Sequence, residues 1–242
     1  MSEGRQVHDV HDVPGLHGAV GAPLLAFDTS TESLAVAAGG PRGVCVRNLP
    51  GGPAASALLL PTIEAVLAEA GLHLRDLGAI AFGRGPGAFT GLRTSCAVAQ
   101  GLAFGLGGAL WPLDSLRIVA EDAFPAAAAT GPRRVAVAMD ARMDEIYGAV
   151  LEREDATAAA GQDGPPPTWR DVHPPALYTL AAWNARVESE AGGLHGLHGL
   201  TGSALAAFGP RLHRPGGIEA RSDETDRAMA LWGPLLDDSA PD

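Results

Sequence analysis

The residues LLAFDTSTESLAVAA, 24–38, and MDARMDEIYGAV, 139–150, carry one pattern twice in a single chain. In each copy an apolar, strand-like run ends in an aspartate, a short polar turn follows, and a second apolar run begins. At one constant offset the matched pairs are Asp28 with Asp140, Glu32 with Asp144, and Leu34 with Ile146. Two such units predict a duplicated α/β fold.

Between the two copies, strand-like and helix-like segments alternate. Apolar runs bounded by glycine or proline predict further strands, at residues 43–49, 78–83 and 109–114. From Ser56 to Ala70 the apolar residues recur with the period of a helix, and Pro61 predicts that this helix starts or kinks there. A second helix is expected over 94–106, a stretch without any charged side chain.

The composition excludes several chemistries. The 17 basic residues are all arginine, against 28 acidic residues, which gives a formal charge of −11. Without lysine there is no P-loop lysine, no Schiff base and no kinase-type Lys–Glu pair. An acidic chain also lacks the clustered positive charge with which a protein grips nucleic acid by itself.

The cysteines and the apolar segments bear on the compartment. Cys45 and Cys96 are too few for a disulfide framework, which favours a reducing, cytoplasmic setting. Residues 94–113 are uncharged and long enough to span a membrane, but five glycines and prolines interrupt them. We expect a buried helix, a turn and a strand there, and no membrane partner.

The expected organisation is two domains with a leading extension. Residues 1–22 have little to bury and are predicted to be a disordered extension. An N-terminal domain is expected over 23–114 and a second, degenerate domain over 115–214. An amphipathic segment over 222–237 is predicted to be a helix that packs back on the first domain.

Three segments give the chain a family resemblance. The segments LLAFDTSTESLAVAA, AFGRGPGAFTGLRTSCAVAQGLAFG and MDARMDEIYGAV, taken in this order over residues 24–151, resemble the bacterial TsaB (YeaZ) family. The resemblance implies the duplicated actin-like, sugar-kinase and Hsp70 ATPase fold (ribonuclease H-like), an α/β fold with a mixed five-stranded sheet in each domain, in strand order 3-2-1-4-5. The extension before Leu24 is not a feature of that family.

The resemblance also implies a function without catalysis. Members of the family support tRNA threonylcarbamoyladenosine modification by pairing with TsaD, which transfers threonylcarbamoyl from threonylcarbamoyl-adenylate to N6 of the adenosine beside the anticodon. The resemblance further implies docking of the ATPase TsaE, tRNA contact only through the complex, and a homodimer as an alternative state of the isolated chain.

Two turns are candidates for binding an anion or a nucleotide. In an actin-like ATPase, the positions of Asp28 and Thr29 hold hydrated Mg²⁺ and phosphate. Asp140 is the counterpart of Asp28 in the second domain, and in a kinase-like site it would face Asp28 across a cleft. The block GRGPGAFTGLR fails both the Walker and the GxGxxG patterns, yet it opens a helix, so that an anion could sit near Arg84 or Arg93. The candidate residues are Asp28, Thr29, Arg84, Gly85, Gly87 and Asp140.

Each of these candidates has a structural alternative. Asp28 could cap its own turn, and the glycines could serve a tight strand-to-helix turn with structural arginines. Arg142 could neutralise a nearby carboxylate such as Asp144. ATP or ADP with Mg at the junction of the complex is therefore the one cofactor under consideration.

The two helices of the first domain are the candidate partner surface. Small residues spaced four apart on the second helix would let another helix approach closely, and the apolar stripe of the first helix would extend that face. The alternative is that both helices only cover their own sheet. The candidate partner-binding residues are Leu59, Ile63, Val66, Ala70, Phe89, Arg93, Ala97, Gly101, Leu102 and Gly105, with Phe89 expected to be exposed.

No catalytic residue or metal site emerges from the spacing of chemically active side chains. The pairs His8 with His11 and His195 with His198 lie in low-complexity segments, and zinc needs three or four ligands of fixed geometry. Two enzymatic alternatives stay open. One is a small-molecule kinase or ATPase using Asp28 and Asp140, and the other is a glycoprotease-like peptidase.

Overall fold

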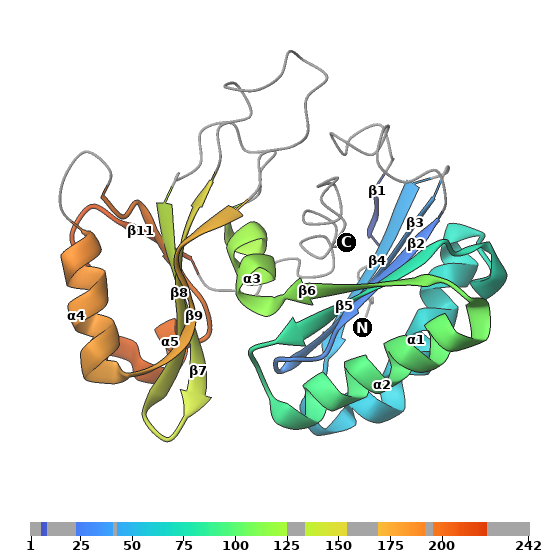
Figure 1. Ribbon diagram of the computed structural model, residues 1–242, viewed down its shortest axis with the longest axis horizontal. Helices are drawn as coiled ribbons and strands as arrows, with labels where there is room; N and C mark the ends of the chain where they lie inside the picture. Colours follow the sequence, from blue (N-terminus) through green and yellow to red (C-terminus); the bar gives the residue numbers. More distant parts are fainter. Residues whose placement is uncertain are drawn as a thin grey trace, which may run out of the picture. The chain divides into compact units, whose positions relative to one another are not determined.

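The computed structural model describes residues 6–8, 23–40, 43–124, 134–153, 169–191 and 196–221. The chain divides into two compact units between Ser115 and Leu116. Each unit is built on one mixed β-sheet that carries helices (Figure 1).

The first unit contains a six-stranded sheet in the spatial order β1-β4-β3-β2-β5-β6. Three sequential strands pair antiparallel through short connections, and β5 and β6 then continue the sheet parallel to β2. The strands are β1 (Gln6–His8), β2 (Leu24–Asp28), β3 (Ser33–Gly40), β4 (Gly43–Pro50), β5 (Ala79–Gly85) and β6 (Ala109–Asp114).

Strand β1 corrects the prediction that residues 1–22 are disordered throughout. Gln6–His8 pair antiparallel with Val44–Val46 of β4. The physical reason is that β4 would otherwise be an edge strand, whose unpaired N–H and C=O groups accept any extended segment largely regardless of its sequence. The remainder of the predicted extension, and the segment 222–237, lie outside the described residues.

Helices α1 (Ala55–Ala70) and α2 (Phe89–Leu106) lie side by side on one face of this sheet (Figure 1). α1 ends at Ala70, as the period predicts, and Gly71 follows it in the left-handed conformation at φ 65°. Pro61 lies inside α1, so the helix does not start there. α2 begins at Phe89, earlier than the predicted 94, because the last residues of the glycine-rich block already form its first turn.

The second unit contains a five-stranded sheet in the order β11-β10-β7-β8-β9. Its core has two layers, since α3 packs on one face of the sheet while α4 and α5 pack on the other. Its elements are α3 (Ser115–Ala123), β7 (Arg134–Arg142), β8 (Glu145–Arg153), β9 (Trp169–Thr179), α4 (Leu180–Glu190), β10 (Gly199–Thr201), α5 (Ala204–Phe208) and β11 (Glu219–Arg221).

The two sheets share one topology. When the added strand β1 is set aside and strands are numbered within each unit, both sheets have the order 3-2-1-4-5. In the first hairpin Asp28 pairs with Ala35, and in the second Asp140 pairs with Ile146, so the second turn is shorter by one residue. The predicted fold class, a duplicated actin-like α/β fold, is therefore confirmed.

Candidate docking face and glycine-rich turn

The turn after β2 is closed by its own side chains. The Asp28 carboxylate is fully buried and accepts hydrogen bonds from the backbone N–H of Ser30 (2.9 Å) and from its hydroxyl (2.8 Å). The Thr29 hydroxyl donates to the carbonyl oxygen of Gly91 (2.7 Å) and lies 2.7 Å from the Ser95 hydroxyl. Asp28 thus caps its own turn, which is the structural alternative foreseen for it.

The glycine-rich block packs directly against that turn, and we call this contact surface the seat of the turn. A Cβ atom at Gly83 would lie 2.2 Å from Asp28 Oδ1, one at Gly87 would lie 2.5 Å from the Ser30 carbonyl oxygen, and one at Gly91 would lie 1.8 Å from the Thr29 carbonyl oxygen. Real Cβ atoms essentially never approach that closely, so only glycine fits at the three positions. The periodic glycines of the block are explained by this packing.

This geometry does not fit a nucleotide phosphate at the Asp28 turn. A phosphate loop offers outward backbone N–H groups and space for close approach. Here the Ser30 N–H is bonded to Asp28, the Ala88 N–H donates to the Ser30 carbonyl (2.7 Å), and the glycine surfaces are covered by the turn. No step of the function proposed below depends on ATP, ADP or Mg at this turn.

Arg84 and Gly85 occupy the end of β5. The Arg84 guanidinium lies 3.7 Å from the Asp114 carboxylate, and the Gly85 N–H donates to the Ser115 hydroxyl at 3.2 Å. Gly85 has φ +101°, which a residue with a side chain rarely adopts. These interactions tie β5 to the end of β6, while anion binding by Arg84, Gly85 and Gly87 stays a prediction.

In the second unit, Asp140 also caps its own turn. Its carboxylate accepts a hydrogen bond from the Arg142 N–H (2.8 Å) and lies 3.4 Å from the Arg142 guanidinium. Asp144 is paired with Arg211 at 2.6 and 3.0 Å, and this hydrogen-bonded cation lowers the pKa of the Asp144 carboxyl from its ordinary value. Anion binding by Asp140 stays a prediction.

The apolar stripe of α1 is not on the surface, which corrects one part of the predicted partner face. Leu59, Ile63 and Val66 are at most 1% exposed and pack into the core of the first unit. The reason is that this stripe is the one with which α1 covers β3 and β4, so the helical period marked the inward side. Ala70 and Leu102 are partly buried against the same core.

The remaining predicted residues lie on the outward side of α2. We define the outward face as the exposed arc of α2 that carries two aromatic rings, one cation and a row of small residues. Its members are Phe89, Arg93, Ala97, Gly101, Phe104 and Gly105. Phe89 is 66% exposed, as expected from the sequence, and Phe104 is 93% exposed. A Cβ atom at Gly101 or Gly105 would meet nothing within 4 Å.

Phe104 is a further candidate for partner contact, one that is not among the residues predicted from the sequence. Its signal was available, because Phe104 follows Phe89 by about four helical turns and therefore points to the same side of α2. On α1, Leu58 and Leu60 are also exposed, at 36% and 47%. On α2 itself, Phe89 and Phe104 are two large apolar side chains exposed on one helix, and exposed apolar side chains of this kind are typical of contacts with another protein.

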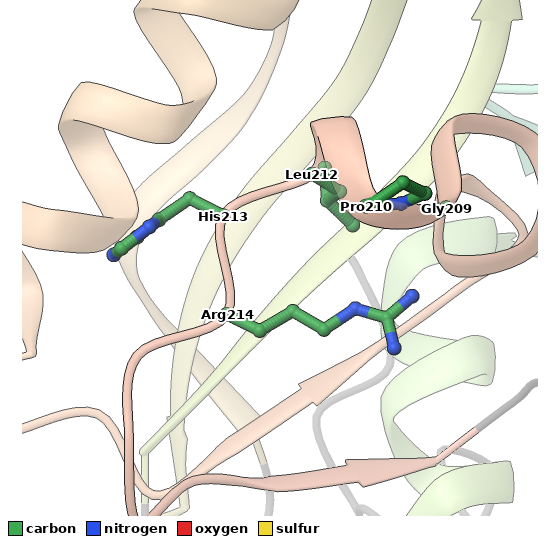
Figure 2. A pocket seen from close by; sticks show the side chains of 5 residues that line it. All are labelled: Gly209, Pro210, Leu212, His213 and Arg214. Carbon is green, nitrogen blue, oxygen red and sulfur yellow. The ribbon is translucent and has the colours of Figure 1, made fainter.

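A hollow of about 570 Å³ lies in the second unit. It is lined by Gly209, Pro210, Leu212, His213 and Arg214 (Figure 2). All five residues belong to one short segment, and the Arg214 guanidinium is engaged with the Leu205 carbonyl at 2.8 Å. Binding sites usually gather polar groups from several elements, so this hollow is a poor candidate for one.

Two further candidate features have structural explanations. In the described part of the chain, the helical stretch Gly52–Ala70 is long and apolar enough to cross a membrane, but its buried stripe packs on its own sheet, as in the core helix of a globular unit. Among the described residues, no group of three His, Cys, Asp or Glu side chains could hold a metal ion. His195 lies outside the described residues, and His198 is exposed.

The fold and these turns define a class: a duplicated actin-like α/β protein whose first glycine-rich block seats its own β2 turn. Comparison with solved structures finds YeaZ from Pseudomonas aeruginosa, with a TM-score of 0.66 and 30% sequence identity over 89% of this chain and 90% of that one.

Sequence comparisons agree with the structural match. The family model described as "TsaD: tRNA N6-adenosine threonylcarbamoyltransferase" matches residues 53–164. The tRNA threonylcarbamoyladenosine biosynthesis protein TsaB of Haemophilus influenzae is 40% identical over 62% of this chain and 61% of the relative, and that of Escherichia coli is 36% identical over 54% and 56%. The chain thus spans about three-fifths of these curated relatives. It belongs to the TsaB (YeaZ) family.

Proposed function

We propose that this chain is a non-catalytic subunit in the synthesis of threonylcarbamoyladenosine in tRNA, and that it acts by docking on TsaD. Relatives named TsaB are described as tRNA threonylcarbamoyladenosine biosynthesis proteins. In this proposal TsaD performs the transfer of threonylcarbamoyl, and this chain holds TsaD in its active form. TsaE docks on the pair, tRNA is contacted only through the complex, and the assembly works in the cytoplasm.

The outward face of α2 is the observation that carries the proposal. Phe104 leaves 93% of its surface in water, which is unfavourable unless another molecule covers it. The open glycines Gly101 and Gly105 lie beside it, and a ridge of small residues lets the backbone of a second helix come close. A second copy of the chain is the alternative occupant of this face when TsaD is absent.

The experiment is reconstitution of the modification from purified components. TsaD, TsaE, ATP, threonylcarbamoyl-adenylate and unmodified tRNA are incubated with and without this chain, and threonylcarbamoyladenosine is measured by mass spectrometry. We expect formation to require the chain. Equal product in its absence would contradict the proposal, and ATP turnover by the chain alone that disappears in Asp28→Asn would support the kinase or ATPase alternative.

A matched pair of variants connects this activity to the outward face. Gly101→Trp fills open space on α2, so the chain should stay folded while association with TsaD and product formation are lost. Gly216→Trp is the control, because its Cβ atom also meets nothing within 4 Å but lies in the second unit. Normal association of Gly101→Trp would contradict docking through α2.

A further inference from the structure

The first turn of α2 carries an exposed cation stacked on an exposed ring. The Arg93 guanidinium carbon lies 3.8 Å from the centroid of the Phe89 ring, four residues before it on the same side of the helix. The Phe89 side chain is 66% exposed, and Arg93 is exposed beside it. Stacking of this kind holds the flat guanidinium in one orientation, with its N–H edges directed away from the ring.

Arg93 is set apart by its charge environment. It is the one charged residue in α2. No carboxylate within the described ranges lies at ion-pair distance from it, whereas Arg84, at the end of β5, has Asp114 at 3.7 Å. The chain as a whole carries a formal charge of −11, so carboxylates outnumber arginines, yet none of the described carboxylates pairs with Arg93.

The chemistry of the pair defines the group that it would bind. An arginine fork donates two parallel hydrogen bonds to a carboxylate or a phosphate. Binding to nucleic acid rests on several clustered cations, and the outward face has a single one on an acidic protein. Arginine and aromatic residues are also enriched among the residues that dominate protein–protein affinity. These observations favour a carboxylate side chain of a protein partner.

We propose that the Phe89–Arg93 pair is the polar anchor of the outward face, and that the partner subunit presents a carboxylate side chain to the Arg93 guanidinium. The inference rests on the proposed function, because it takes the partner to be TsaD. Phe104 is then the apolar anchor at the other end of the same face. It lies about 22 Å along the helix from Phe89, at a rise of about 1.5 Å per residue. A partner helix lying between the two anchors would cross Ala97, Gly101 and Gly105.

The test measures the affinity of the full chain for TsaD at low and high salt. Arg93→Gln keeps the length and polarity of the side chain but removes its charge. We expect affinity to fall by about 10-fold to 100-fold at low salt, and the salt dependence of binding to become weaker. Arg93→Lys should recover part of the affinity, and Arg93→Glu should bind more weakly than Arg93→Gln.

Controls separate this inference from the proposed function. Arg75→Gln removes another exposed arginine of the same unit and should leave both affinity and salt dependence unchanged. Melting curves of each variant establish that it is folded.

If Gly101→Trp fails to bind TsaD while Arg93→Gln binds like the parent with the same salt dependence, the anchor is overturned and docking through α2 stands. If Gly101→Trp binds normally, docking itself fails. A loss of tRNA binding by the complex without a loss of TsaD affinity in Arg93→Gln would also overturn the anchor, in favour of a phosphate ligand.

Discussion

At the scale of single residues, the absence of a side chain at Gly91 allows α2 to pack against the turn after β2. Gly91→Ala would place Cβ 1.8 Å from the Thr29 carbonyl oxygen, and backbone on both sides leaves little room to yield. We expect Gly91→Ala to lower the free energy of unfolding by about 3 kcal/mol, at the upper end of overpacking costs. Urea unfolding measures this change. Gly101→Ala is the control, and equal losses in the two variants would contradict the seat described for the β2 turn.

A second residue-scale prediction concerns the Asp144–Arg211 pair. The guanidinium holds the pKa of the Asp144 carboxyl below its ordinary value, so the stabilisation from this pair is present above that ordinary value and is lost as pH falls through the lowered pKa. Arg211→Gln should therefore raise the Asp144 pKa. Carboxyl carbon NMR over an acid titration measures it, with Arg75→Gln as control. An unchanged Asp144 pKa in Arg211→Gln would count against the pair in solution.

At the scale of elements, α2 should separate stability from association. Glycine inside a helix costs about 1 kcal/mol relative to alanine, and the Cβ positions of Gly101 and Gly105 are open. The double variant Gly101→Ala, Gly105→Ala should unfold at a higher temperature. Gly101→Leu should also keep the fold but weaken binding to TsaD, because its side chain fills the space that a partner helix needs. Thermal melting and titration with TsaD measure the two effects. If Gly101→Leu bound TsaD as tightly as the parent or more tightly, the open space at Gly101 would have no role in docking.

Sequence patterns predicted some elements well and others poorly, for physical reasons. The period of α1 was read correctly, but periodicity marks an apolar side without saying whether sheet or partner covers it, and Leu59 and Ile63 proved to be core. Strand β9 was not predicted, because Pro174 and Pro175 argue against a strand interior and fit only the edge position that β9 occupies. The glycine block was recognised as a turn, but its contact with Thr29 is long-range and invisible to local pattern.

At the scale of the whole molecule, the duplication gives each unit its own sheet and its own core. The core of the first unit joins α1 and α2 to strands β2–β5. The second unit encloses Trp183, fully buried on α4 beside Tyr178, with ring centroids 5.3 Å apart. Since the outward face belongs to the first unit alone, damage to the second core should spare it.

Gly148→Ala tests this separation. Its Cβ atom would lie 2.3 Å from the Trp183 ring, and an indole packed on all sides cannot move aside without disturbing α4. We expect a loss of about 2 kcal/mol, confined to the second unit. Native-state hydrogen exchange should show faster exchange in β7, β8 and α4, with β2, β5 and α2 unchanged, while affinity for TsaD is retained. Equal acceleration of exchange in both units would mean that the two cores unfold as one. Loss of TsaD binding in a variant whose α2 amides stay protected would mean that docking needs more than the outward face.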